Sequence, residues 1–100
     1  MNVQEALKQV GEGYQQSVKP WIEKENYGMA YFEFSNLCFL LEQYLTEVYD
    51  QINCGLSLIS SAQNLKQKLQ GGDKESIEFS VRLFETFYAQ TKLPLDTSTA

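Results

Sequence analysis

The feature that most constrains this chain is an apolar stripe at helical spacing between residues 34 and 53. Six apolar residues recur there at steps of three and four: Phe34, Leu37, Leu41, Leu45, Val48 and Ile52. Such spacing places side chains on one face of an α-helix. The opposite face is polar, and no lysine or arginine occurs between Tyr27 and Cys54. The pattern predicts an amphipathic helix over about residues 29–53, central in a compact all-α bundle of three to four helices.

Helical periodicity also marks a segment at the N-terminus, over about residues 3–19. Its stripe consists of Val3, Leu7, Val10, Tyr14 and Val18. Gly11 within it would allow a neighbouring helix to approach closely. Pro20 has no backbone N–H, so the helix either kinks there or gives way to a short new turn. Residues 23–28 are polar and contain Gly28, which predicts the first loop.

Residues 56–70 form a third periodic segment, with Leu58, Ala62, Leu65 and Leu69 at helical spacing. Gly55 separates it from the central helix and either breaks the chain into two helices or only bends one long helix. We favour two helices, because the run Asn53-Cys54-Gly55 suits the end of a helix.

A fourth helix is predicted over residues 74–91, after the strong break at Gly71-Gly72, with Asp73 as its N-cap. It carries two apolar rows: Ile77, Val81, Phe84 and Tyr88, and Phe79, Leu83 and Phe87. Together the rows cover more than half of the circumference, so this helix is either central in its own bundle or shared with a partner. We expect one domain over residues 1–92 and a flexible tail over 93–100.

The charge balance narrows the range of partners. The formal net charge is -5 and the pI about 4.6, which disfavours nucleic-acid binding by phosphate neutralisation. A basic protein partner fits better.

No apolar run reaches the ~20 residues that span a bilayer, and no secretory signal is visible, so we expect no membrane association. Cys38 and Cys54, about 24 Å apart along a straight helix, predict reduced thiols in a cytoplasmic protein.

The residue inventory argues against catalysis. The chain has no histidine, which is the commonest general base and metal ligand. Its acids fall on polar helix faces, and two distant cysteines do not make a zinc site. The run around Cys38 is apolar and offers no base or cation to activate a nucleophile. We therefore expect no enzyme, and no catalytic, metal-binding or cofactor-binding residue.

Phe39 departs from the pattern of the central helix. Its neighbours three and four positions away are Ser35, Asn36, Glu42 and Gln43, all polar. Phe32 lies one heptad earlier on the same side, so the two could form an aromatic ridge rimmed by acids. Three explanations stay open: another helix of this domain packs there, a second copy packs there, or a foreign partner binds there. The candidate partner-binding residues are Phe32, Phe39, Glu42, Gln43, Asp50, Phe79 and Leu83.

These features predict a small acidic, non-enzymatic protein-interaction module, such as an adaptor, chaperone or inhibitor. One alternative is a structural or regulatory homodimer that satisfies the apolar surplus itself, chiefly through residues 74–91. Another is an acidic nucleic-acid mimic, for which thirteen acids against eight bases is a thin surplus. The sequence carries no motif that identifies a family.

Overall fold

The computed structural model describes residues 2–91, in which the regular secondary structure is entirely helical. The elements are α1 (Val3–Gly13), a π-helical turn η1 (Tyr14–Val18), α2 (Lys19–Glu23), α3 (Tyr27–Leu45), a 3-10 turn η2 (Tyr49–Gln51), α4 (Gly55–Gly71) and α5 (Lys74–Thr91). The predicted all-α bundle is confirmed. Residue 92 and the predicted tail over 93–100 lie outside the described residues.

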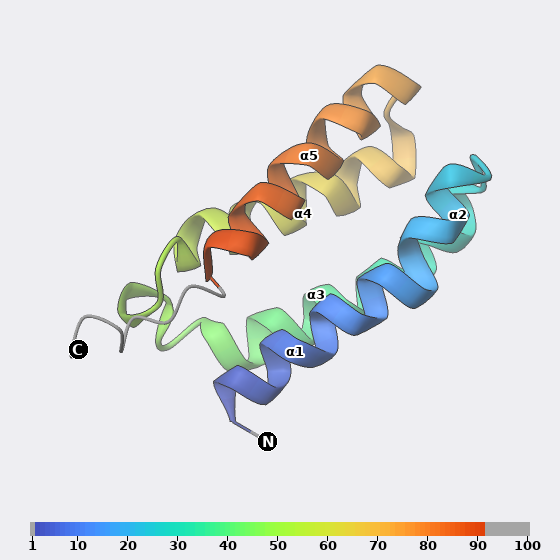
Figure 1. Cartoon of the computed structure of the whole chain (residues 1–100). Helices are drawn as coiled ribbons and strands as arrows, with labels where there is room; N and C mark the ends of the chain where they lie inside the picture. The colour runs from blue at the N-terminus through green and yellow to red at the C-terminus, as the bar shows by residue number, and fades with distance from the viewer. Residues whose placement is uncertain (1, 92–100) are drawn as a thin grey trace.

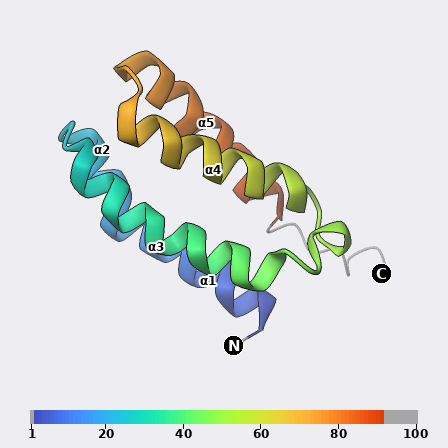
Figure 2. The same ribbon diagram turned by 180° about the vertical axis from the view of Figure 1, so that it is seen from behind.

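The bundle consists of two antiparallel pairs of helices laid side by side (Figure 1). The continuous arm α1–η1–α2 runs along α3, and α4 runs along α5. Seen from behind, α3 and α4 lie next to each other and join the two pairs (Figure 2). The helix α3 is central in that it packs against both the N-terminal arm and α4.

The first arm continues through Pro20 because the helix widens just before it. Over η1 the backbone N–H of Lys19 bonds the C=O of Tyr14, five residues back. In a regular α-helix the ring of Pro20 would meet the carbonyl of Gln16. The π-turn accommodates the ring, as such single-turn insertions do. Of the two outcomes predicted at Pro20, the structure shows a new short helix, with proline in its first turn.

The arm ends in a turn that reverses the chain into α3. Asn26 N–H bonds the C=O of Trp21 at 2.8 Å, and Glu25 N–H bonds that of Ile22 at 2.9 Å. This is the Schellman arrangement, which requires a left-handed residue, and Glu25 adopts φ 60° there. The Asn26 side chain then accepts a hydrogen bond from Met29 N–H and caps α3. The loop predicted over residues 23–28 is therefore present but shorter, because α3 begins at Tyr27, two residues earlier than expected.

The end predicted for the central helix is wrong: α3 ends at Leu45, not near residue 53. Thr46 turns its hydroxyl back to the C=O of Glu42, a bond that competes with helix continuation. The chain then makes η2 and a left-handed turn at Cys54 before α4 starts. The apolar spacing misled because Ile52 packs against the core from this loop.

Gly55 is the residue that seats this loop. A Cβ atom at this position would lie 2.3 Å from the carbonyl oxygen of Tyr49, so only glycine lets η2 fold over the start of α4. The prediction of two helices is therefore correct. The predicted cap of α5 is also present, since the Asp73 carboxylate accepts a hydrogen bond from Ser76 N–H at 2.8 Å.

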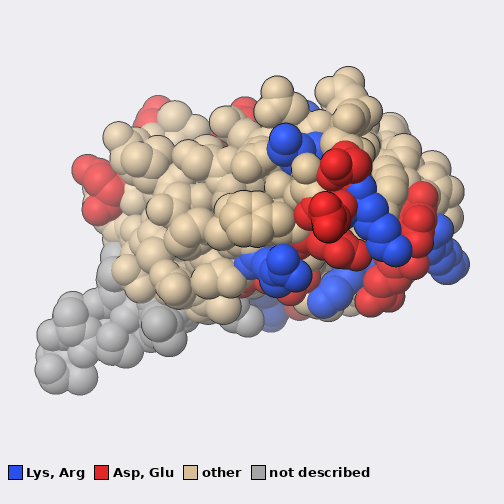
Figure 3. Space-filling model, turned by 90° about the horizontal axis from the view of Figure 1, so that it is seen from above, with Lys and Arg blue, Asp and Glu red and all other residues tan. Residues whose placement is uncertain are grey.

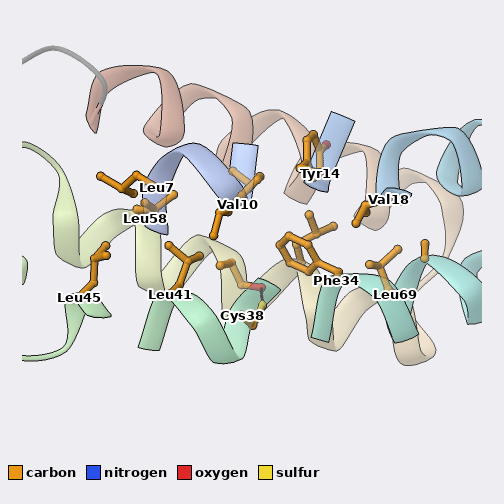
Figure 4. Packing of buried hydrophobic residues seen from close by; sticks show 14 of the residues in the cluster. Leu7, Val10, Tyr14, Val18, Phe34, Cys38, Leu41, Leu45, Leu58 and Leu69 are labelled. Carbon is orange, nitrogen blue, oxygen red and sulfur yellow. Dashed lines mark hydrogen bonds between the residues drawn. The ribbon is translucent and has the colours of Figure 1, made fainter. Parts of the chain in front are cut away.

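The core fills the space between the two helix pairs (Figure 4). The arm contributes Leu7, Val10, Tyr14 and Val18; α3 contributes Ala30, Phe34, Cys38, Leu41 and Leu45; α4 contributes Leu58, Ala62, Leu65 and Leu69; α5 contributes Ile77 and Phe84. At its middle, the rings of Tyr14, Phe34 and Phe84 meet with centroids 5.0 to 6.1 Å apart. Aromatic contacts of this kind add to the stability gained by burial.

Candidate functional site

Two phenylalanines on the outer face of α3 are the most unusual surface feature of the described residues. Phe39 is 69% exposed and Phe32 is 61% exposed, although Phe34, between them on the inner face, is fully buried. No helix of the bundle covers them. Packing of Phe39 within this domain, the first of the three explanations, is therefore wrong, and the other two remain open.

The two phenylalanines belong to a row along the outer face of α3. The row, called here the α3 ridge, consists of Met29, Phe32, Asn36, Phe39 and Gln43, all exposed. Their steps of three and four residues keep them on one side of the helix. Phe32 and Phe39 are about 10 Å apart along the axis, and the whole ridge is about 21 Å long. It is a surface to which another helix could lie parallel over about four turns.

Acidic side chains flank the ridge. Glu33 lies on the side nearer the N-terminal arm, and Glu42 lies on the side of α4, where it accepts a hydrogen bond from Gln63 at 2.9 Å. Glu47 follows just after the helix. No lysine or arginine occurs in α3 itself. Lys66 of α4 lies near enough to Cys38, on the inner face of α3, for its charge to lower the pKa of that thiol, although burial has the larger effect.

Of the predicted partner-binding residues, the structure brings Phe32, Phe39, Glu42 and Gln43 together on one exposed helix. Asp50 is not on that helix, because α3 ends five residues before it and Asp50 lies in η2. Phe79 and Leu83 lie on α5, in the other helix pair. The predicted residues therefore form two surfaces, one on α3 and one on α5.

The second surface lies along the outer side of α4 and α5. Phe79 is 55% exposed, and Leu83 and Phe87 line a shallow groove of about 330 Å³ whose α4 side is formed by Leu56 and small polar residues. Leu56 is exposed, and it is not among the partner-binding residues predicted from the sequence. Its position outside the buried stripe of α4 is the signal that could have identified it. Seen from above, charged side chains gather toward the end with α2 and the α4–α5 turn, and most of the remaining face is uncharged (Figure 3).

A wider cleft lies between the N-terminal arm and α5. Its volume is about 1100 Å³, and its lining includes Tyr14, Phe84 and Tyr88. The Tyr88 hydroxyl crosses to α1 and donates to the C=O of Leu7 at 2.6 Å. A Cβ atom at Gly11 would lie 2.0 Å from that hydroxyl, so Gly11 makes room for a tyrosine side chain of α5 and not, as predicted, for the close approach of a neighbouring helix.

Polar side chains bridge the same cleft nearer α2. The buried hydroxyl of Tyr14 donates to the Glu85 carboxylate at 2.7 Å, and Lys19 Nζ lies 3.2 Å from the same oxygen. Burial, and then the bond to the carboxylate, raises the pKa of Tyr14 far above its ordinary value of 10.0. Tyr14 is therefore a neutral donor that fixes the separation of η1 and α5. No pattern in the sequence predicts this contact, because its partners are 71 residues apart.

The cysteines differ in their surroundings. Cys38 is buried, its Sγ lies 3.7 Å from the C=O of Ala62, and desolvation raises the pKa of its thiol to about 12. Cys54 is partly exposed and its thiol contacts the side-chain oxygen of Gln90 at 2.8 Å. Neither forms a disulfide. Within residues 2–91, no group of three or more metal-ligating side chains could hold an ion.

Comparison with known proteins gave no relative. No family model, no curated protein and no solved structure matches this chain. In the described part of the chain, no helix combines the length and apolar character needed to cross a bilayer. The functional argument therefore depends on the surfaces themselves.

Proposed function

We propose that this protein is a small, non-enzymatic protein-interaction module that binds its partner through the α3 ridge. The observation that carries the proposal is the exposure of Phe32 and Phe39, one heptad apart on the outer face of one helix. Large aromatic side chains dominate the energetics of protein interfaces, where they fill partner pockets. Leaving two of them in water without a partner gives the fold no stability.

The remaining chemistry supports a binding role over catalysis. The sequence has no histidine, and the high pKa of the buried Cys38 thiol keeps it protonated and unreactive near neutral pH. Unpaired thiols fit a reducing compartment, so we place the module in the cytoplasm. Adaptors, chaperones and inhibitors are the functional classes that need only a stable scaffold and one exposed surface.

A homodimer is the second candidate, favoured by the exposed Phe79 and the groove beside it on α4 and α5. That surface could be covered by a second copy, as an otherwise unsatisfied apolar row on a helix often is. The two candidates use different helices, and this makes them separable by substitution.

The test compares two matched variants, Phe32→Ser/Phe39→Ser and Phe79→Ser, with the unaltered protein. Light scattering after size exclusion gives the mass, 11.5 kDa for one chain. We expect each of the three proteins to be a monomer. We also expect the unaltered protein and Phe79→Ser to capture a protein from the native host, and the α3 double variant to lose this binding. A dimer that only Phe79→Ser dissociates, with capture unaffected by the α3 substitutions, would favour the second candidate and count against the first.

A further inference from the structure

We propose that the α3 ridge binds a basic amphipathic helix of a partner protein, and not a second copy of this chain. This inference rests on the proposed function, because it assigns the chemistry of the partner at the same surface. Its argument is the combination of an apolar ridge with a helix whose own charged residues are all acidic.

The ridge has the form of a helix-packing surface. Phe32 and Phe39 stand one heptad apart and are separated by Asn36, so a partner helix can lie alongside with apolar residues at every third or fourth position. Amphipathic helices that bind a protein surface do so through apolar residues spaced three and four positions apart on one face. Met29, also exposed, extends the apolar part of the ridge by about one turn toward the start of α3, and methionine adapts its shape to a range of partners.

The charges around the ridge select the sign of the partner. Glu33, Glu42 and Glu47 flank it, and the chain has no basic residue from Tyr27 to Cys54. A partner with lysine or arginine beside its apolar row would place cations opposite these carboxylates. Complementary potentials of this kind accelerate association and exclude partners of the wrong sign. An acidic or neutral helix would gain the apolar contact without this attraction.

The same charges disfavour self-association through the ridge. Two copies packed face to face would bring the flanking acids of one α3 close to those of the other, and α3 supplies no cation to compensate. Like charges brought together at an interface disfavour the contact. Self-association therefore fits the surface along α4 and α5, where acids and bases both occur, better than it fits the ridge.

The experiment uses synthetic amphipathic peptides as probes, each about 18 residues or five helical turns long. The three peptides share one leucine row at helical spacing and carry lysine, glutamine or glutamate at all other positions. Fluorescence anisotropy of labelled peptides gives the affinity for the full chain at roughly 50 and 300 mM salt. We expect the lysine peptide to bind at least tenfold more tightly than the glutamine peptide, and the glutamate peptide to bind least.

Two variants show whether binding occurs at the ridge. Phe32→Ser/Phe39→Ser keeps every charge and should lose at least tenfold in affinity for the lysine peptide, whereas Phe79→Ser should lose less than twofold. Binding that depends on the two phenylalanines but not on peptide charge would overturn the inference and leave the proposed function standing. Binding of the lysine peptide unaffected by the α3 substitutions would be nonspecific charge attraction and would also overturn it. A dimer dissociated by the α3 substitutions would identify a second copy as the occupant and refute the basic helix.

Discussion

The inner and outer faces of α3 carry the same type of side chain with opposite consequences. On the inner face, Phe34 is fully buried and meets the ring of Phe84 edge to face, with centroids 5.1 Å apart. On the outer face, Phe32 and Phe39 are largely exposed. Identical residues on one helix thus divide into those that hold the fold together and those that are left exposed to solvent. The difference comes from their angular position and not from their hydrophobicity.

The largest effect is expected from Phe34→Ala. Removing a buried ring at the meeting point of three helices loses its transfer free energy and leaves a cavity, a loss of about 3–5 kcal/mol. Urea denaturation followed by circular dichroism measures it. The matched variant Phe39→Ala should change the free energy of unfolding by less than about 0.5 kcal/mol. Equal losses in the two variants would contradict the assignment of the two faces.

Leu41→Ala tests the inner face nearer the end of α3, and should cost about 2–5 kcal/mol, as for other buried leucines. Leu41 is almost completely buried within the core. A convenient comparison is Gln43→Ala, two residues further on the outer face, which should be nearly neutral. If the melting temperature were unchanged in Leu41→Ala, the orientation of α3 would be wrong.

The sequence predicts the inner face well, because burial follows the period of the helix. The positions of Phe34, Leu41 and Leu45 are all correct, and so is the cap at Asp73, where a local hydrogen bond decides the structure. The end of α3 could not be predicted in the same way. Val48 and Ile52 continue the apolar spacing, but the chain leaves the helix at Thr46 to reach α4. The close fit of Gly55 against Tyr49 that fixes this loop is a tertiary contact.

For the outer face, the sequence allows three explanations of Phe39 and does not decide between them. The polar neighbours of Phe39 show that it departs from the stripe, but spacing alone does not say whether another helix covers it. That depends on how the helices are arranged around α3, which the structure supplies. For the same reason the bonds from α5 to the N-terminal arm, made by Tyr88 to Leu7 and Glu85 with Tyr14, have no signature in the sequence. Contacts between distant segments require the fold.

A third prediction uses the thiol on the inner face. The Cys38 pKa is raised from its ordinary value of 9.0 to about 12, so the unfolded chain loses this proton at a lower pH than the folded chain. Folding stability should therefore fall as the pH rises above about 9. Between pH 8 and 10 the contribution of this group is a loss of about 1.4 kcal/mol. Urea denaturation at pH 8, 9 and 10 measures it.

The control for this prediction is Cys38→Ala, which should be less stable at pH 8 but lose less stability on going to pH 10. The pKa values of Tyr14 and Tyr88 are raised in the same direction from ordinary values of 10.0, so these groups add a smaller loss that begins near the top of that range. Identical pH dependence in Cys38→Ala and the unaltered protein would show that the alkaline loss arises from a group other than Cys38.

The smallest effect is expected from Phe39→Glu on the outer face. Glutamate has a better helix propensity than phenylalanine, and its carboxylate at this exposed position stays in water. Repulsion by Glu42, three residues on, should cost a few tenths of a kcal/mol. The helical circular dichroism should be unchanged and the free energy of unfolding should stay within about 0.5 kcal/mol. A large loss of helical signal would place Phe39 in the core, and the separation of the two faces would fail at its most exposed residue.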